Sequence, residues 1–281
     1  MSRAPSTTLI NGQPGGYVDA GERALQYGDG LFETISCCQG RPRWLERHLQ
    51  RLREGCRRLQ LHFADEALLC AEVAQLAAGP APCIVKVIVS RGVSTRRGYR
   101  PSGEERPTRI VSRHDWPQDP AGQRPLRVGL SAVALGINPR LAGLKHLNRL
   151  EQVLAQLDKP DSLDEVLMAA SNGELVGGSM GNVFLVDEQG LFTPSVQQCG
   201  VAGVMRARVL EALAAAAPAG MAADMAAAIR TLPLGELARV REAFVTNVRW
   251  GIRSIGELDG RALPSDDWAQ RLRRLIDAAD V

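Results

Sequence analysis

Asn138-Pro-Arg-Leu-Ala-Gly-Leu-Lys-His-Leu-Asn-Arg-Leu-Glu-Gln152 joins a Pro-containing connection to the start of an apolar-periodic helix, and it holds Lys145. The chain has only two other lysines: Lys86 inside an apolar strand pattern and Lys159 in a charged turn. In the small, apolar surroundings of Lys145 the amine could be partly desolvated, which would free it as a nucleophile. A surface lysine whose stem covers apolar surface at a helix N-terminus is the alternative, and local sequence leaves both open.

The residues before this stretch predict a mixture of strands and helices. A hairpin is expected from Thr8–Ile10 and Tyr17–Asp19 around the turn Asn11-Gly12. Leu45–Leu59 is expected to be helical because apolar side chains recur there at spacings of four and three. A second helix over Asp65–Ala77 would be capped by Asp65. Further strands are expected at Leu31–Ser36, Cys83–Ser90, Thr108–Ser112 and Leu126–Ala134.

The residues after the opening stretch continue the mixed pattern. A helix over Leu147–Leu157 has apolar side chains on one side, and others are expected over Val204–Ala215 and Asp266–Ala279, the last capped by Ser265. Strands are expected at Glu165–Ala170, Asn182–Val186 and Glu242–Thr246. Because strands and helices do not alternate strictly, the pattern favours the α+β (mixed α/β) class. The 281 residues suggest about two domains, which we place at 1–134 and 140–281 with a linker at 135–139.

Composition limits the possible functions. Hydrophobic residues make up 45% and charged residues 23%, as in ordinary globular proteins, and a net charge of +3 is too small to indicate a nucleic-acid binder. The six cysteines form no C-x-x-C pair, so we expect no metal site and a reducing, cytoplasmic location. No signal-peptide pattern opens the chain, and the Ala-rich stretch 212–228 is too interrupted to span a membrane. A small-molecule substrate is the remaining expectation.

Three places could bind an anion. Gly200-Val-Ala-Gly-Val204 runs into a predicted helix, where backbone N–H groups and the helix dipole favour phosphate. Thr246-Asn247 ends a predicted strand, and Arg51 lies at the edge of the apolar stripe of the first helix. Many helices begin with glycine, however, and the arginine-rich segment 41–58 is equally typical of a solvated helical face. The chain has no H-E-x-x-H, G-x-S-x-G or P-loop motif.

Several blocks of the chain resemble the class IV pyridoxal-phosphate enzymes, a group with branched-chain and D-amino-acid aminotransferases and aminodeoxychorismate lyases. They are Arg23-Ala-Leu-Gln-Tyr-Gly-Asp-Gly-Leu-Phe-Glu-Thr34, His48-Leu-Gln-Arg-Leu52, Ser90-Arg-Gly92, Arg97-Gly-Tyr99, and Thr193-Pro194 followed by Gly200–Arg206. Within the group, Lys145-His-Leu-Asn-Arg-Leu-Glu-Gln152 is similar to the aminodeoxychorismate lyases.

The resemblance implies a cofactor and residues that bind it. Lys145 would bond pyridoxal 5′-phosphate covalently and act as the catalytic base. The phosphate would be held by Arg51, by the backbone of Val204 and Met205, and by Thr246 with Asn247. The architecture would be that of a two-domain fold-type-IV enzyme, with a smaller N-terminal α/β domain, a larger C-terminal cofactor-binding domain, and a homodimeric assembly.

The resemblance also implies a reaction. A lyase of this kind converts 4-amino-4-deoxychorismate to 4-aminobenzoate and pyruvate in folate biosynthesis; the alternative is an aminotransferase acting on D- or branched-chain amino acids. Because the lyase substrate has two carboxylates, cationic side chains should bind it. The candidates, for which a plain surface role is the alternative in a chain with 31 arginines, are Arg91, Arg97, Tyr99, Arg149 and Arg249.

One position departs from the family pattern. Relatives usually have a glutamate, which bonds the pyridine nitrogen, five residues before the Asn of an N-x-F motif. Here Asn182-Val-Phe184 is present but the fifth residue back is Gly177. Glu174, three residues earlier, would face the opposite side of an extended strand unless a β-bulge re-aims it. Without the carboxylate the cofactor would be a weaker electron sink, which a lyase tolerates better than an aminotransferase.

Overall fold

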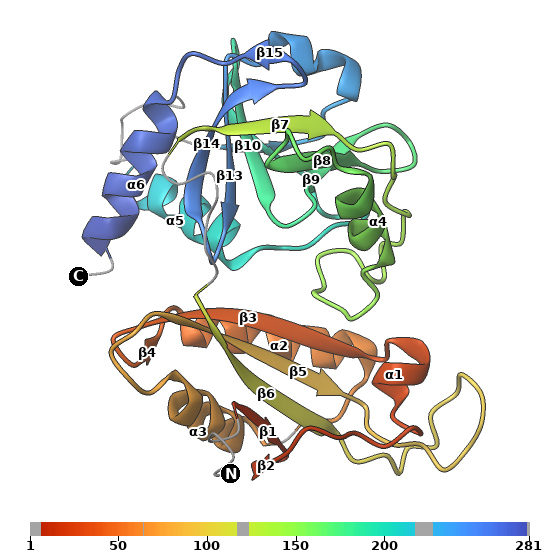
Figure 1. The fold of residues 1–281 in the computed structure, drawn as a ribbon. Coiled ribbons are helices and arrows are strands. Elements are labelled where there is room, and N and C mark those ends of the chain that lie inside the picture. The colour runs from red at the N-terminus through yellow and green to blue at the C-terminus, as the bar shows by residue number, and fades with distance from the viewer. Residues whose placement is uncertain (1–6, 64, 117–123, 217–226, 280–281) are drawn as a thin grey trace. The chain divides into compact units, whose positions relative to one another are not determined.

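The computed structural model describes residues 7–63, 65–116, 124–216 and 227–279 of the 281-residue chain. The chain divides into two compact units, shown in Figure 1: residues 1–118 together with 144–148, and residues 119–143 together with 149–281. This division differs from the predicted boundaries at 134 and 140. The short segment 144–148, which holds Lys145, belongs to the first unit because its backbone pairs with a strand there.

Within its described residues the first unit is built on a six-stranded antiparallel sheet with the order β2-β1-β6-β5-β3-β4. Three helices accompany the sheet: α1 (Arg23–Tyr27), α2 (Leu45–Leu59) and α3 (Glu66–Ala77). The strands are β1 (Thr8–Ile10), β2 (Gln13–Pro14), β3 (Gly30–Cys38), β4 (Arg41–Pro42), β5 (Cys83–Ser90) and β6 (Thr108–Asp115).

The core of the first unit lies between the sheet and helices α2 and α3. Helix α2 packs on β3, and α3 packs on β5 and β6. Alternate residues of the strands are buried against these helices, among them Leu31 and Ile35 of β3 and Val87 of β5. By the same alternation Glu33 faces the helices, so β3 carries a carboxylate into the layer between the sheet and the helices.

Two predictions in the first unit are corrected. The first hairpin turns at Asn11-Gly12 as expected, with both residues at positive φ, but its second strand is Gln13–Pro14 rather than Tyr17–Asp19. Asp65 precedes α3 but makes no capping hydrogen bond; its carboxylate instead accepts from Arg109 at 2.8 Å. The two-residue turn puts the second strand directly after Gly12, whereas at Asp65 the tertiary contact with Arg109 outweighs the capping signal.

The described part of the second unit contains a nine-stranded mixed sheet with the order β12-β11-β10-β13-β14-β7-β8-β9, in which β15 pairs with β14. The helices are α4 (Leu150–Asp158), α5 (Val204–Ala216) and α6 (Asp267–Ala279), with a 3₁₀ helix at Leu234–Arg239. The strands are β7 (Leu126–Leu130), β8 (Glu165–Ala169), β9 (Leu175–Gly178), β10 (Asn182–Asp187), β11 (Gly190–Pro194), β12 (Ala228–Arg230), β13 (Glu242–Asn247), β14 (Gly251–Leu258) and β15 (Arg261–Ala262).

This second sheet curls back on itself. Strand β9 stands at one end of the order, yet it contacts β10 and β11 near the other end. A single apolar cluster accordingly draws residues from seven of the strands, including Leu167 of β8, Leu185 of β10 and Val245 of β13. Helices α5 and α6 pack on each other and on β13. The mixed α+β class predicted from the sequence is confirmed.

Three elements of the second unit have bounds that differ from those predicted. Strand β7 stops at Leu130 rather than Ala134, and α6 begins at Asp267, where the hydroxyl of Ser265 bonds Glu242 and Asp267. Helix α4 begins at Leu150 because the backbone of Leu147 bonds Gly30 instead. Its apolar stripe faces outward, with Leu150 76% and Leu157 74% exposed. No helix in the described ranges has the length and apolarity needed to cross a bilayer.

Candidate functional site

Lys145 lies on a short extended segment at the edge of the first sheet. Its carbonyl accepts a hydrogen bond from the backbone N–H of Phe32 at 2.9 Å, and the N–H of Leu147 bonds the carbonyl of Gly30 at 3.0 Å. The Lys145 ammonium lies 4.3 Å from the centroid of the Phe32 ring. Lys86 approaches the same ring at 5.5 Å. The predicted nucleophile is thus half-buried and held by backbone pairing.

On the helix-facing side of β3, Arg51, His48 and Glu33 form a compact cluster. Arg51 binds Glu33 through two parallel hydrogen bonds, Nε to Oε1 at 2.8 Å and Nη2 to Oε2 at 2.5 Å. Nδ1 of His48 lies 2.6 Å from Oε2 of the same carboxylate. The helical spacing of three between positions 48 and 51 puts both side chains on the face of α2 that packs on β3.

Electrostatics fix the charge states in this cluster. Burial alone would raise the pKa of Glu33, but the charge of Arg51 and the hydrogen bonds from His48 and Arg51 outweigh it and lower the pKa to about 2. Burial lowers the pKa of His48, partly opposed by the hydrogen bond to Glu33 and assisted by the charges of Arg51 and Lys145. An ionised carboxylate only accepts, so Nδ1 of His48 must be the donor.

The substrate candidates of the first unit have different surroundings. Arg91 donates to both oxygens of Asp29 and to the carbonyls of Leu59 and Gln60, which favours a structural role. Tyr99 is exposed, packs edge-on against Tyr27, and its carbonyl accepts from Arg23. Arg97 lines a cavity of about 750 Å³. The other charged side chains around this cavity are Arg91, Arg96, Arg100 and Glu105.

In the second unit the predicted phosphate residues gather at the start of α5. Gly143 holds the turn before the helix through two hydrogen bonds. Its N–H donates to the carbonyl of Gly200, and its carbonyl accepts from the N–H of Ala202. A Cβ at Gly203 would lie 2.1 Å from Oδ1 of Asn182, so only glycine allows this approach. The first N–H groups of a helix have no intrahelical acceptor, and here they belong to Val204 and Met205, so this helix start favours an anion.

Thr246 and Asn247 end β13 directly beside this turn. Thr246 pairs with Asn182 of β10 and donates its hydroxyl to the Asn182 carbonyl at 3.5 Å. The Asn182 side chain donates in turn to the carbonyl of Val201 at 2.9 Å, which ties the strand ends to the glycine turn. The fold thus brings Thr246 and Asn247 close to the turn before α5, and Asn182 bonds to both sides.

The strand that holds Gly177 contains a β-bulge. Met168 of β8 pairs with Gly177, but Ala169 pairs with Leu175, so Val176 is the extra residue. The bulge returns Glu174 to the same face as Gly177, which corrects the expectation from strict alternation. Glu174 is close enough to contribute to the raised pKa of the Cys199 thiol, which burial dominates. A Cβ at Gly177 would lie 3.0 Å from the carbonyl of Gly181 and 3.6 Å from Cα of Asn182.

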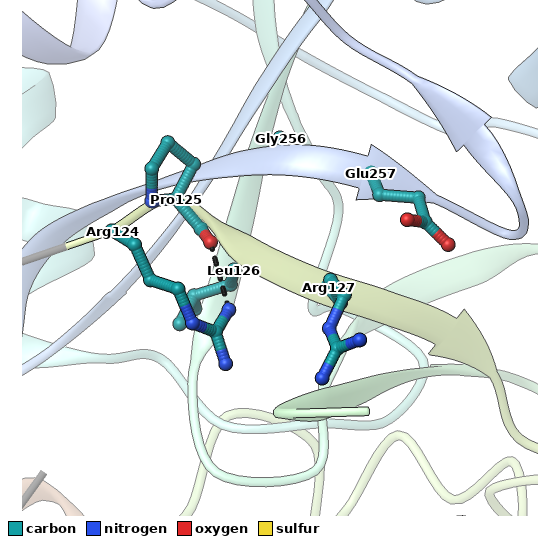
Figure 2. A pocket seen from close by; sticks show the side chains of 6 residues that line it. All are labelled: Arg124, Pro125, Leu126, Arg127, Gly256 and Glu257. Atoms are coloured by element: carbon teal, nitrogen blue, oxygen red, sulfur yellow. Dashed lines mark hydrogen bonds between the residues drawn. The ribbon is translucent and has the colours of Figure 1, made fainter. Parts of the chain in front are cut away.

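The remaining substrate candidates flank these elements. Arg149 immediately precedes α4, and the Arg249 guanidinium lies 5.7 Å from the centroid of the Trp250 ring. The second unit has a separate cavity of about 540 Å³, lined by Arg124, Arg127 and Glu257 among others. Figure 2 shows the side chains that line it. None of the predicted site residues lines it, so it is not the candidate site.

The sequence predictions missed Glu33, His48 and Asn182. A signal for the first two was present: Glu33 occupies an inward position of an alternating strand, and His48 lies on the apolar side of its helix, between Leu45 and Leu52. Buried charged or polar groups need partners, which points to a shared contact. The described residues contain no cluster of three metal-ligating side chains.

The sequence is similar to a known protein family and to known proteins. Residues 30–258 match the model of the family described as Amino-transferase class IV. An aminodeoxychorismate lyase from Vibrio harveyi is 37% identical over 213 residues, which cover 73% of this chain and 76% of the relative.

Solved structures of related proteins have a similar fold. The crystal structure of 4-amino-4-deoxychorismate lyase from Pseudomonas aeruginosa has a TM-score of 0.88 and 38% identity, covering 98% of this chain and all of that one. A hypothetical aminotransferase from Mycobacterium tuberculosis, in a PLP-bound form, has a TM-score of 0.78 at 22% identity, over 98% of this chain and 99% of that one. At that identity the likeness concerns the fold alone.

Proposed function

Because the chain belongs to the class IV aminotransferase family, whose members use pyridoxal 5′-phosphate, we propose that it is a lyase acting on 4-amino-4-deoxychorismate. The products would be 4-aminobenzoate and pyruvate, within folate biosynthesis. The observation that carries the proposal is the 37–38% identity to two such lyases over most of the chain. The shared reaction needs one amine that can take a proton, and Lys145 is half-buried beside Phe32.

The side chains fit the cofactor that the family uses. The N-terminus of α5, the close approach at Gly203 and the hydroxyl of Thr246 suit a phosphate dianion, and so does the guanidinium of Arg51. We assign these groups, with Val204, Met205 and Asn247, to the phosphate, and Lys145 to the covalent bond. When bound, pyridoxal phosphate supplies an electron sink for the carbon that bears the substrate amino group.

Lys145 would carry out the proton transfer. Its neutral amine removes the proton at C4 of the substrate ring, the C3–O bond breaks, and the enolpyruvyl group leaves as the ring becomes aromatic. The leaving group takes a proton and becomes pyruvate. Arg97 remains a candidate for a substrate carboxylate because it lines a cavity rich in arginine, and Tyr99, Arg149 and Arg249 remain proposals of the same kind. The contacts of Arg91 make it the weakest of these candidates.

The decisive experiment compares two lysines that approach the same aromatic ring. Lys145→Ala should reduce pyruvate release by at least about a thousandfold and abolish borohydride trapping of the cofactor. Lys86→Ala, the matched control, should retain both. Peptide mapping that placed the trapped label on Lys86 or Lys159, or pyruvate release that survived Lys145→Ala, would refute the assignment.

The alternative activity, amino-group transfer with D- or branched-chain amino acids, is tested at Gly177. We propose that the missing carboxylate at this position disfavours transamination. The Cβ of Gly177→Glu would lie 3.0 Å from the Gly181 carbonyl, which must give way by a few tenths of an ångström, so circular dichroism should first compare the fold of the variant with that of the parent. When amino acids are added, the variant should convert more of its bound cofactor to the amine form than the parent does. The absorbance of the cofactor measures this conversion. No increase would count against this role of Gly177.

We propose that a second copy of the chain covers the exposed stripe of α4, consistent with the homodimer that the family resemblance implies. Leu150, Val153, Leu154 and Leu157 follow the i, i+3, i+4, i+7 pattern of a helix-packing face. In an antiparallel pair related by a twofold axis, Arg149 at the start of one helix would lie near Asp158 at the end of the other. A cytoplasmic location stays a prediction of the sequence.

Light scattering after size exclusion tests this surface. Leu154→Glu should convert a dimer to monomer, while Leu25→Glu, at an exposed apolar position of α1, should leave the dimer intact. A monomeric parent protein, or a dimer that tolerates Leu154→Glu, would refute the proposed surface.

A further inference from the structure

The fully buried carboxylate of Glu33 has no role in the chemistry described above. It is 2% exposed, lies on β3, and binds two side chains of α2. We propose that Glu33, supported by His48, is a positioning residue that aims the guanidinium of Arg51 at an incoming phosphate group. The inference rests on the proposed function of Arg51 as a phosphate ligand, and the test below separates the two.

The geometry holds the guanidinium by one edge. Nε and Nη2 of Arg51 each bond a different oxygen of Glu33, so the plane of the guanidinium is set by the plane of the carboxylate. The edge that carries Nη1 is not engaged by Glu33. An arginine held in this way loses little further side-chain freedom when its other edge binds an anion, which improves affinity by preorganisation.

The carboxylate is itself held in place. On β3 the backbone of Glu33 pairs with Val87 of β5, and Nδ1 of His48 donates to Oε2 of the carboxylate. Within the described residues Nε2 of His48 is buried and has no hydrogen-bond partner, so the one polar link of this side chain runs to Glu33. His48 therefore acts on Arg51 through the carboxylate.

Charge gives a second reason for a carboxylate at this position. Arg51 is largely buried, and Lys145 is close enough to His48 to depress the pKa of its imidazole. Two neighbouring cations without a counter-charge would be costly in a protein interior. Glu33 supplies a counter-charge to Arg51 before any phosphate binds.

The same unit offers a matched control. Glu72 of α3 binds Arg109 of β6 in an equally buried ion pair, with Nη2 and Oε1 2.9 Å apart and both side chains 7% exposed. This pair joins a helix to a strand as Glu33 and Arg51 do, but it contains no predicted site residue. A purely structural effect of losing a buried carboxylate should therefore be reproduced by Glu72→Gln.

The experiment compares two ligands that differ only in the phosphate. Apo-protein is titrated with pyridoxal 5′-phosphate and with pyridoxal, and the ratio of the two affinities is measured for each variant. Glu33→Gln should lower this ratio by about tenfold, the size of one charge-assisted hydrogen bond, with pyridoxal affinity unchanged. Glu72→Gln should leave the ratio unchanged. An unchanged or increased ratio in Glu33→Gln overturns the positioning role.

Further variants keep the test decisive if Glu33→Gln folds poorly. His48→Leu should lower the ratio, and His48→Asn, which retains a donor near the place of Nδ1, should restore it toward the parent value. Equal ratios in the two His48 variants overturn the supporting role. Arg51→Gln separates the hypotheses: an unchanged ratio refutes Arg51 as the phosphate ligand, whereas a lowered ratio there with a normal one in Glu33→Gln refutes only the positioning by Glu33.

Discussion

Each unit of this protein buries a glutamate, and the two carboxylates differ in what surrounds them. Glu33 in the first unit binds the guanidinium of Arg51 and the imidazole of His48. Glu165 in the second unit is fully buried, but it accepts from the hydroxyl of Ser179 and the backbone N–H groups of Val166 and Met180. No salt bridge to Glu165 exists in the part of the chain that the structure describes.

The difference in partners reverses the direction of the pKa shift. Burial raises the pKa of Glu165, and its hydrogen bonds only partly oppose this. At Glu33 the cation reverses the effect of burial and lowers the pKa to about 2. The same residue type is therefore an anion paired with Arg51 and His48 in one unit, and in the other it is a carboxyl that accepts several hydrogen bonds without a cation. Neighbouring charge, rather than burial, decides which.

The largest effect should come from neutralising the two carboxylates at pH 7. Glu33→Gln leaves Arg51 without its anion and should reduce the free energy of unfolding by about 3 kcal/mol. Glu165→Gln removes no ion pair and should cost about 1 kcal/mol or less. Urea unfolding of both variants measures the difference. Equal losses would mean that Arg51 does not depend on Glu33 for stability.

The next largest effect is expected when the pH is lowered, because Glu33 then becomes protonated. Because the folded-state pKa of Glu33 lies below its ordinary value of 4.5, its contribution is present above pH 4.5 and is lost as the pH falls toward 2. Between pH 5 and pH 3 the parent protein should lose about 2 kcal/mol more than Glu33→Gln. Unfolding curves at the two pH values test this, and parallel losses in the two proteins would contradict it.

Glu165 should show the opposite sign. Its raised pKa means that the folded state favours the protonated carboxyl, so ionisation costs stability as the pH rises above 4.5. The stability of the parent relative to Glu165→Gln should therefore decrease from pH 4.5 upward. A difference that is constant with pH would show that Glu165 stays in one charge state over the range.

The smallest effect is expected at the hydroxyl beside Glu165. Ser179→Ala removes one donor from a carboxyl that keeps the N–H groups of Val166 and Met180, so the loss should be about 1 kcal/mol at most. Thermal or urea unfolding at pH 7 measures it. A loss as large as that of Glu33→Gln would mean that a hydroxyl alone can substitute for a cation at a buried carboxylate.

The sequence anticipated the elements whose signals are local. Helix α2 has the bounds expected from the spacing of its apolar side chains, and β5 matches its expected range. The family resemblance carried by the blocks around Lys145 and Arg51 is confirmed by the family model and by relatives at 37–38% identity. The second strand of the first hairpin is Gln13–Pro14 rather than the predicted Tyr17–Asp19, because it pairs with β1 directly after the two-residue turn.

Other features depend on residues far apart in the chain. The bulge at Val176 turns Glu174 onto the face of Gly177, and it is visible only in the pairing with β8. The sequence predicts the apolar stripe along 147–157, but only the folded unit shows that it faces outward. Periodicity identifies an apolar face but not what that face packs against, so neither outcome followed from pattern alone.

By itself the sequence determined the type of each long element, the family and the identity of the candidate lysine, because these depend on side chains close together in the chain. Tertiary structure alone decided that Glu33 is an anion held between His48 and Arg51, and that Lys145 pairs with the edge of β3. A pKa and a hydrogen-bond partner depend on which charges meet in space, and folding brings position 33 to positions 48 and 51.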